Sequence, residues 1–129
     1  MYSRRDSIFD YGCKVIIDGV EIEYIDVSGD FNKDRKTIDI AGYNLINSEF
    51  YELKVRPDSF KDNVIKYLNI LKLEALSNKI SENIKVGCVS LESRVSLKKQ
   101  LKIIKRKYDV EYEGLEIIGK DEIRELISK

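Results

Sequence analysis

Three side chains, Asp39, Glu52 and Lys54, have the types and spacing that metal-dependent chemistry requires. Glu52 and Lys54 stand two positions apart, so in a strand both point to the same side. If the segment carrying Asp39 pairs with this strand, the two carboxylates converge and can bind a divalent cation, with the carbonyl of Leu53 as a third ligand. Lys54 would lie beside the metal, where it can orient or deprotonate water or neutralise charge on a phosphate. The pattern favours hydrolysis of phosphodiesters.

The composition narrows the chemistry to carboxylates and lysines. The 129 residues contain no histidine, which excludes a Ser-His-Asp triad, a Cys-His pair and a His-ligated zinc. An oxygen-rich site favours Mg²⁺ or Mn²⁺. The two cysteines, Cys13 and Cys88, are too few for a disulfide framework, so we expect two buried free thiols in a cytoplasmic protein.

Charge is distributed unevenly along a chain whose net charge is zero. Residues 1–53 contain 6 basic and 11 acidic side chains, whereas residues 54–129 contain 17 basic and 12 acidic ones. No apolar run approaches the roughly 20 residues of a membrane span, and no linker-like stretch interrupts the chain. We therefore expect one domain over residues 1–129 and no membrane partner.

Short alternating segments in the first half predict antiparallel strands. The segments are Cys13–Ile17 and Val20–Val27, joined at Asp18-Gly19, and then Lys36–Tyr43 and Glu49–Arg56. In the last segment Tyr51, Leu53 and Val55 form an apolar face, and Glu52 and Lys54 lie on the opposite face.

Behind Pro57 the apolar residues recur at helical spacing. They predict a helix over Ser59–Lys79, capped by Asp58 or by Ser59 with Asp62. Further elements are predicted in the order strand, helix, strand, helix, at Ile84–Leu91, Ser93–Tyr108, Val110–Ile118 and Asp121–Ser128. The fold class is α/β or α+β, with a mixed central sheet flanked by helices.

The segments 37–41 and 50–56 together resemble the D…ExK signature of the PD-(D/E)XK nuclease superfamily, most closely its archaeal Holliday-junction resolvase and Mrr-like restriction branch. The resemblance covers about 20–92. It implies a restriction-endonuclease-like fold, Asp39 and Glu52 as metal ligands, Lys54 as the catalytic lysine and Mg²⁺ or Mn²⁺ as cofactor. It also implies that the chain forms a homodimer, and its short front end fits a domain of a larger protein.

The predicted helix 93–108 carries positive side chains with no acid between Arg94 and Lys107. Its apolar face leaves them on an outer surface that suits a phosphate backbone, or that is simply solvated. The predicted nucleic-acid contacts are Arg56, Arg94, Lys98, Lys99, Lys102, Lys105 and Arg106.

Three functions follow as hypotheses. The first is a metal-dependent endonuclease acting on DNA. The second is an inactive module of the same fold that binds nucleic acid or protein. The third is an RNA-cleaving toxin domain that is blocked by an immunity partner. The alternative reading of Asp39, Glu52 and Lys54 is a solvated sheet face with cross-strand pairs.

Overall fold

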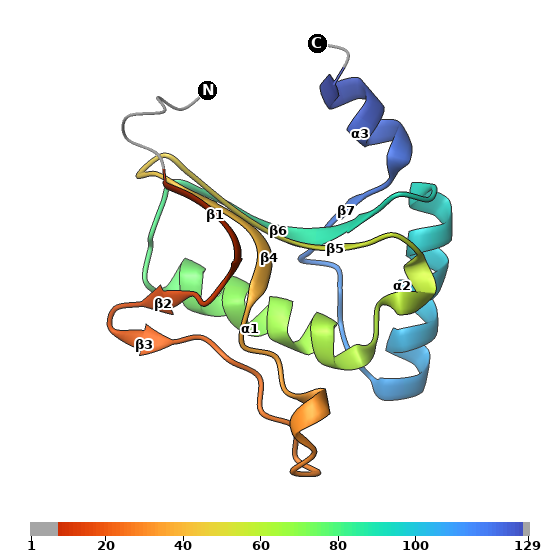
Figure 1. Cartoon of the computed structure of the whole chain (residues 1–129), viewed down its shortest axis with the longest axis horizontal. Helices are drawn as coiled ribbons and strands as arrows, with labels where there is room; N and C mark the ends of the chain where they lie inside the picture. Colours follow the sequence, from red (N-terminus) through yellow and green to blue (C-terminus); the bar gives the residue numbers. More distant parts are fainter. Residues whose placement is uncertain (1–7, 128–129) are drawn as a thin grey trace.

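The computed structural model describes residues 8–127, which form a five-stranded mixed sheet flanked by three helices (Figure 1). The order of the strands in the sheet is β1-β4-β5-β6-β7. Their bounds are β1 Ile8–Cys13, β4 Ile38–Tyr43, β5 Asn47–Lys54, β6 Asn83–Ser90 and β7 Glu116–Ile118. The predicted fold class, a mixed sheet flanked by helices, is confirmed.

The direction of the strands changes in the middle of the sheet. β1, β4 and β5 are antiparallel neighbours, whereas β6 and β7 run parallel to β5. The parallel strands are joined by α1 (Asp62–Ser77) and α2 (Arg94–Tyr108), as parallel neighbours require a crossover connection. Four predicted elements are confirmed, with each end within about two residues of the prediction. They are the strands Lys36–Tyr43, Glu49–Arg56 and Ile84–Leu91 and the helix Ser93–Tyr108.

The core lies between the sheet and α1, which runs along one face of it (Figure 1). In α1 the buried positions recur at helical spacing, and Ile65, Leu68 and Leu71 have no exposed surface. Phe50 and Val86 meet them from β5 and β6. The final helix, α3 (Lys120–Ile127), lies on the other side of the sheet (Figure 1).

The N-terminal prediction is wrong in two ways. The edge strand β1 was not predicted. The predicted strands Cys13–Ile17 and Val20–Val27 reduce to β2 (Ile16–Ile17) and β3 (Val20–Glu21), which form a small hairpin. The Asp18-Gly19 turn itself is confirmed, with both residues at positive φ. Beyond β3 only the bridge between Tyr24 and Arg35 remains, because loop side chains satisfy many of the backbone groups there.

The start of the first long helix also differs from the prediction. α1 begins after Lys61, which provides no side-chain cap, so the predicted Asp58 or Ser59 cap is wrong. Residues 57–59 instead form a short 3₁₀ turn, η2 (Pro57–Ser59), which places Phe60 in the core.

The predicted strand Val110–Ile118 shrinks to β7 because α1 binds the carbonyls of the preceding loop. Asn69 Nδ2 donates to the carbonyl of Glu111 at 2.7 Å, and Lys72 donates to that of Gly114. The predicted C-terminal helix is confirmed as α3, although its predicted end at Ser128 lies outside the described residues. None of the helices in residues 8–127 has the length and hydropathy that crossing a bilayer requires.

Candidate metal and phosphodiester site

Asp39 and Glu52 bind each other's strands through reciprocal hydrogen bonds. The backbone N–H of Asp39 donates to Glu52 Oε1 at 3.1 Å, and the N–H of Leu53 donates to Asp39 Oδ2 at 2.8 Å. In the antiparallel ladder Ile40 pairs with Tyr51. One position further along, Asp39 and Glu52 therefore lie opposite each other. The structure thus brings together the two carboxylates that the sequence predicts.

The pair lies where the regular pairing of β4 with β5 stops. Pairs run from Tyr43 with Ser48 to Ile40 with Tyr51, and beyond this point the carboxylates accept N–H groups in place of carbonyls. On the other side of β4, Gly12 lies opposite Asp39 with a φ of 57°, a conformation that glycine adopts without strain. β5 therefore leaves the regular ladder at Asp39, whereas the register of β1 with β4 continues past it to Cys13 with Ile38.

The side of β5 that carries Glu52 is the covered side of the sheet. Ser48, Phe50 and Glu52 alternate as buried residues, and Glu52 is only 6% exposed. The opposite face, with Leu53 at 39% exposure, is the more open one. The predicted alternation is confirmed, but the alternative of a solvated face for Glu52 is wrong, because α1 packs against this side.

Glu52 has a strongly shifted affinity for protons. Burial, and then the negative charge of Asp39, raise the pKa of Glu52 to about 7, whereas Lys54, the N–H of Asp39 and Arg35 act in the opposite direction. Near neutral pH the carboxyl is therefore divided between its protonated and ionised forms. A buried carboxylate beside a second one is the environment that a divalent cation would stabilise.

Lys54 lies on the same face as Glu52 at the end of β5, and it is half-buried. Its side chain makes no ion pair or hydrogen bond with another described residue, yet its charge acts on Glu52. The N–H of Leu53 points toward β4, and the carbonyl of the same residue in an extended strand points the same way. The predicted third ligand is thereby directed toward Asp39.

The donor set suits a hard cation. Asp39 Oδ1 and Glu52 Oε2 accept no hydrogen bond from a described residue, so each carboxylate has one oxygen fixed by the backbone and one available. In the described residues no three His, Cys, Asp or Glu side chains are grouped so that they could hold a metal ion, so the remaining ligands would be the Leu53 carbonyl and water. This set fits Mg²⁺ or Mn²⁺ better than zinc.

Sequence reasoning missed two residues near Glu52. Arg35 is half-buried, and its positive charge acts on Glu52. Tyr67 of α1 is 1% exposed, and its hydroxyl makes no hydrogen bond to a described residue although it lies within the field of Glu52. Burial raises the pKa of Tyr67, so it stays a neutral phenol. The helical stripe of α1 identified Tyr67 only as a core residue.

The predicted basic helix forms as α2, with Ser93 as its N-cap. Gln100 Nε2 donates to the carbonyl of Phe60 at 2.9 Å, which fixes α2 to the segment that follows Lys54. Lys99, Lys102 and Arg106 are exposed, and Lys98 is half-buried.

The other predicted nucleic-acid contacts have partners within the fold. Lys105 forms ion pairs with Glu111 and Glu113, which lie after the helix. Arg94 Nε donates to the carbonyl of Ile117 at 3.1 Å and lies 3.6 Å from Glu122.

Arg56 forms an exposed ion pair with Asp58 at 3.1 Å. The basic surface is thus carried mainly by Lys98, Lys99, Lys102 and Arg106.

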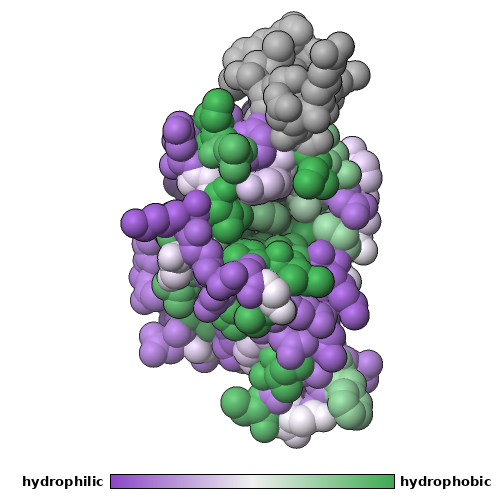
Figure 2. Space-filling model, turned by 90° about the vertical axis from the view of Figure 1, so that its left-hand side faces the viewer, coloured by the Kyte–Doolittle hydropathy of each residue, from purple (hydrophilic) through white to green (hydrophobic). Residues whose placement is uncertain are grey.

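A cavity of about 470 Å³ is lined by residues of β1, β2, β4 and β5, and it opens on the side of the molecule that Figure 2 shows. Its wall is mainly apolar, and it includes Ala41 and Phe50, which are the next residues on this face after Asp39 and Glu52. The end of β1 contributes Cys13, which is half-buried, and burial raises the pKa of its thiol. Cys13 and Cys88 are both free thiols, as predicted, but only Cys88 is fully buried. The cavity contains neither of the two carboxylates.

Comparison of the chain with protein-family models, with curated proteins and with solved structures finds no match.

Proposed function

We propose that this chain is a metal-dependent endonuclease that hydrolyses phosphodiester bonds, with DNA as its first candidate substrate. Asp39, Glu52 and the carbonyl of Leu53 would hold Mg²⁺ or Mn²⁺, and Lys54 would act on the attacking water or on the scissile phosphate. The observation that carries the proposal is the reciprocal pairing of Asp39 and Glu52 where the β4–β5 ladder stops.

The order of the elements supports the resemblance to the PD-(D/E)XK superfamily. In sheet order Asp39 lies on the second strand and Glu52 with Lys54 on the third, and a helix then leads to a parallel fourth strand. This is the arrangement that the resemblance implies. Membership of that superfamily is part of the proposal.

The metal, the carboxylates and Lys54 would each have a different role in the reaction. A metal supplies Lewis-acid stabilisation and an activated water. The carboxylates hold the cation in a half-enclosed site, where electrostatic interactions are stronger than in water. Lys54 is held on the same face without a carboxylate partner at ion-pair distance among the described residues, so its ammonium group is available to a phosphate.

The basic surface of α2 supports a nucleic-acid partner. Lys98, Lys99, Lys102 and Arg106 form no ion pair with described residues, and α2 is fixed next to the segment that follows Lys54. Contacts of this kind position a phosphate backbone without reading its sequence. A homodimer and a cytoplasmic location stay predictions.

One observation favours the second function, an inactive module of the same fold. With a pKa of about 7, Glu52 is partly protonated at neutral pH, and a protonated carboxyl is a poor metal ligand. A measurement of the affinity for Mg²⁺ or Mn²⁺ therefore distinguishes the endonuclease from the inactive module.

The test compares metal-dependent cleavage by the wild type with that by Glu52→Gln and Lys54→Met. With Mg²⁺ or Mn²⁺, the wild type is expected to nick supercoiled plasmid, and each variant is expected to lose at least about 100-fold in rate. Matched controls are Glu49→Gln on β5, one position before Phe50, and Lys85→Met on the neighbouring strand; both should cleave at nearly the wild-type rate.

Circular dichroism confirms that each variant is folded. Absence of cleavage by the folded wild type on duplex, branched, single-stranded and RNA substrates would contradict the proposal. Cleavage of RNA alone would favour the toxin function.

A further inference from the structure

The cavity of about 470 Å³ beside β1 has the size of a small-molecule site, for which roughly 300–1,000 Å³ is typical. One wall is a face of the sheet. Ile8 pairs with Tyr43, and Asp10 pairs with Ala41, which in turn pairs with Phe50. Residues paired in an antiparallel ladder point to the same side of the sheet. All five side chains therefore share the side on which the cavity lies.

The segment that forms β2 provides the opposite wall. Val15 and Ile17 line the cavity from this segment and are buried. Lys14 and Asp18 line it from the same segment and are exposed. Ile80, which follows α1, completes the lining. The cavity thus has apolar walls and a charged, solvent-exposed rim.

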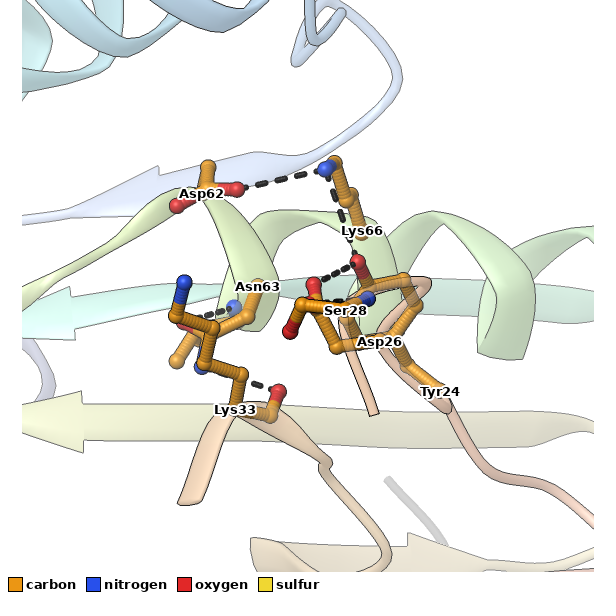
Figure 3. A network of polar contacts seen from close by, with 8 residues as sticks. Tyr24, Asp26, Ser28, Lys33, Asp62, Asn63 and Lys66 are labelled. Carbon is orange, nitrogen blue, oxygen red and sulfur yellow. Dashed lines mark hydrogen bonds and ion pairs between the residues drawn. The ribbon is translucent and has the colours of Figure 1, made fainter. Parts of the chain in front are cut away.

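The chain that follows the hairpin is fixed onto α1, so this wall is held in place (Figure 3). The N–H of Ile22 donates to the carbonyl of Val15 at 2.8 Å. The Tyr24 hydroxyl donates to Asp26 Oδ1 at 2.7 Å, and Lys66 Nζ of α1 lies 3.5 Å from the same hydroxyl. Both walls are therefore part of the folded chain before a ligand binds.

The charges at the rim of the cavity are mainly negative. Lys14 Nζ lies 3.7 Å from Glu21 Oε1, which balances the charge of this lysine. Asp10 Oδ1 accepts the N–H of Tyr11 at 2.8 Å. Within residues 8–127, neither Asp10 nor Asp18 has an ion-pair partner. The rim therefore offers two carboxylates to a ligand of positive charge.

We propose that this cavity binds a small apolar molecule that carries one ammonium group. The apolar walls bury the body of the ligand, and this burial supplies most of the affinity. The ammonium group lies at the exposed rim with Asp10 and Asp18, where opposite charges add selectivity more than affinity. Because the cavity is separate from Asp39 and Glu52, the proposal does not depend on the endonuclease function.

The test compares three probes that share an alkyl chain and differ in the head group: octylammonium, octanol and octanoate. Titration calorimetry measures the affinity of each probe for the full chain. Octylammonium should bind about 3- to 10-fold more tightly than octanol, the range for two exposed ion pairs. Octanoate should bind more weakly than octanol, because the rim repels its charge.

The rim carboxylates are tested by the double variant Asp10→Asn, Asp18→Asn. Asn keeps the acceptor for the N–H of Tyr11, and at position 18 it suits the positive φ of a turn before glycine. This variant should bind octylammonium only as tightly as octanol, with the affinity for octanol unchanged. The matched control is Asp109→Asn with Asp121→Asn, at two exposed positions outside the cavity, and it should keep the preference for octylammonium.

Two measurements locate the bound probe. Ala41→Phe fills the cavity and should weaken the binding of all three probes at least about 10-fold, with circular dichroism to confirm folding. In the wild type, octylammonium at about ten times its Kd should slow the alkylation of Cys13 by N-ethylmaleimide about tenfold, because Cys13 lines the cavity. Cys88 has no exposed surface and serves as the unreactive internal control.

Three outcomes would overturn the proposal. The first is that the wild type binds none of the probes, or binds all three equally. The second is a preference for octylammonium that survives in Asp10→Asn, Asp18→Asn. The third is binding that persists in folded Ala41→Phe and leaves the alkylation of Cys13 unchanged; if Ala41→Phe does not fold, the alkylation of Cys13 decides alone.

Discussion

The carboxylate pair on β4–β5 and the basic surface of α2 are both rich in charge, but the fold treats them differently. Glu52 is 6% exposed and bonded to the neighbouring strand, whereas Lys99, Lys102 and Arg106 on α2 are exposed. A buried charge acts strongly and locally, while exposed charges act weakly and together. We therefore expect single substitutions to change the first region and only combined substitutions to change the second.

The largest expected effect comes from α2, but from its apolar face. Leu101 has no exposed surface, so Leu101→Ala should lower the free energy of unfolding by about 2–5 kcal/mol. Urea denaturation measures this, with Leu91→Ala at an exposed position as control. An effect below about 1 kcal/mol would show that α2 is not part of the cooperative core.

The second-largest expected effect is the contribution of Glu52 to the pH dependence of the protein's stability. Between its ordinary pKa of 4.5 and its folded pKa of about 7, Glu52 is protonated in the folded state and ionised in the unfolded state. The folded state then binds more protons, so stability falls as the pH rises through this window, by about 3 kcal/mol in total.

Glu52→Gln should remove that part of the pH dependence, which denaturation at a series of pH values without metal measures. A saturating divalent cation should raise the stability of the wild type most at the upper end of the window, because it binds the ionised form. Identical pH profiles of the wild type and Glu52→Gln would contradict the shifted pKa.

The smallest effect on stability is expected when Lys98, Lys99 and Lys102 are changed together to Met. This triple substitution should nevertheless change the affinity for DNA. Stability should change little, because none of the three has an ion-pair partner among the described residues. Affinity for DNA should fall, and the slope of its logarithm against that of salt should become shallower by about 2 to 3. Unchanged binding would remove α2 from the proposed interface. A triple change of Lys79, Lys85 and Lys120 serves as a charge-matched control.

Sequence reasoning succeeded where the local pattern and the tertiary environment agree. The alternation around Glu52 and the helical spacing of α1 each bury one face, so β5 and α1 were predictable. The convergence of Asp39 with Glu52 followed from the pairing of two strands joined by a short turn. Element type and the carboxylate pair were therefore within reach of the sequence.

Prediction failed where contacts distant in sequence replace local ones. Residues 110–115 alternate like a strand, but Asn69 and Lys72 bind their carbonyls from α1. Lys105 belongs to an acid-free run, but Glu113 after the helix neutralises it. No local signal reports a partner that arrives through the fold.

By itself, the sequence determined the order of helices and strands from β4 to α3 and the set of groups available for chemistry, because periodicity and composition are properties of the chain. Only the tertiary structure decided that Glu52 lies on the covered face of β5, that Arg35 acts on it, and that Lys105 is paired. The physical reason is that burial and Coulomb interactions depend on distances through space, which the spacing of residues along a chain does not fix.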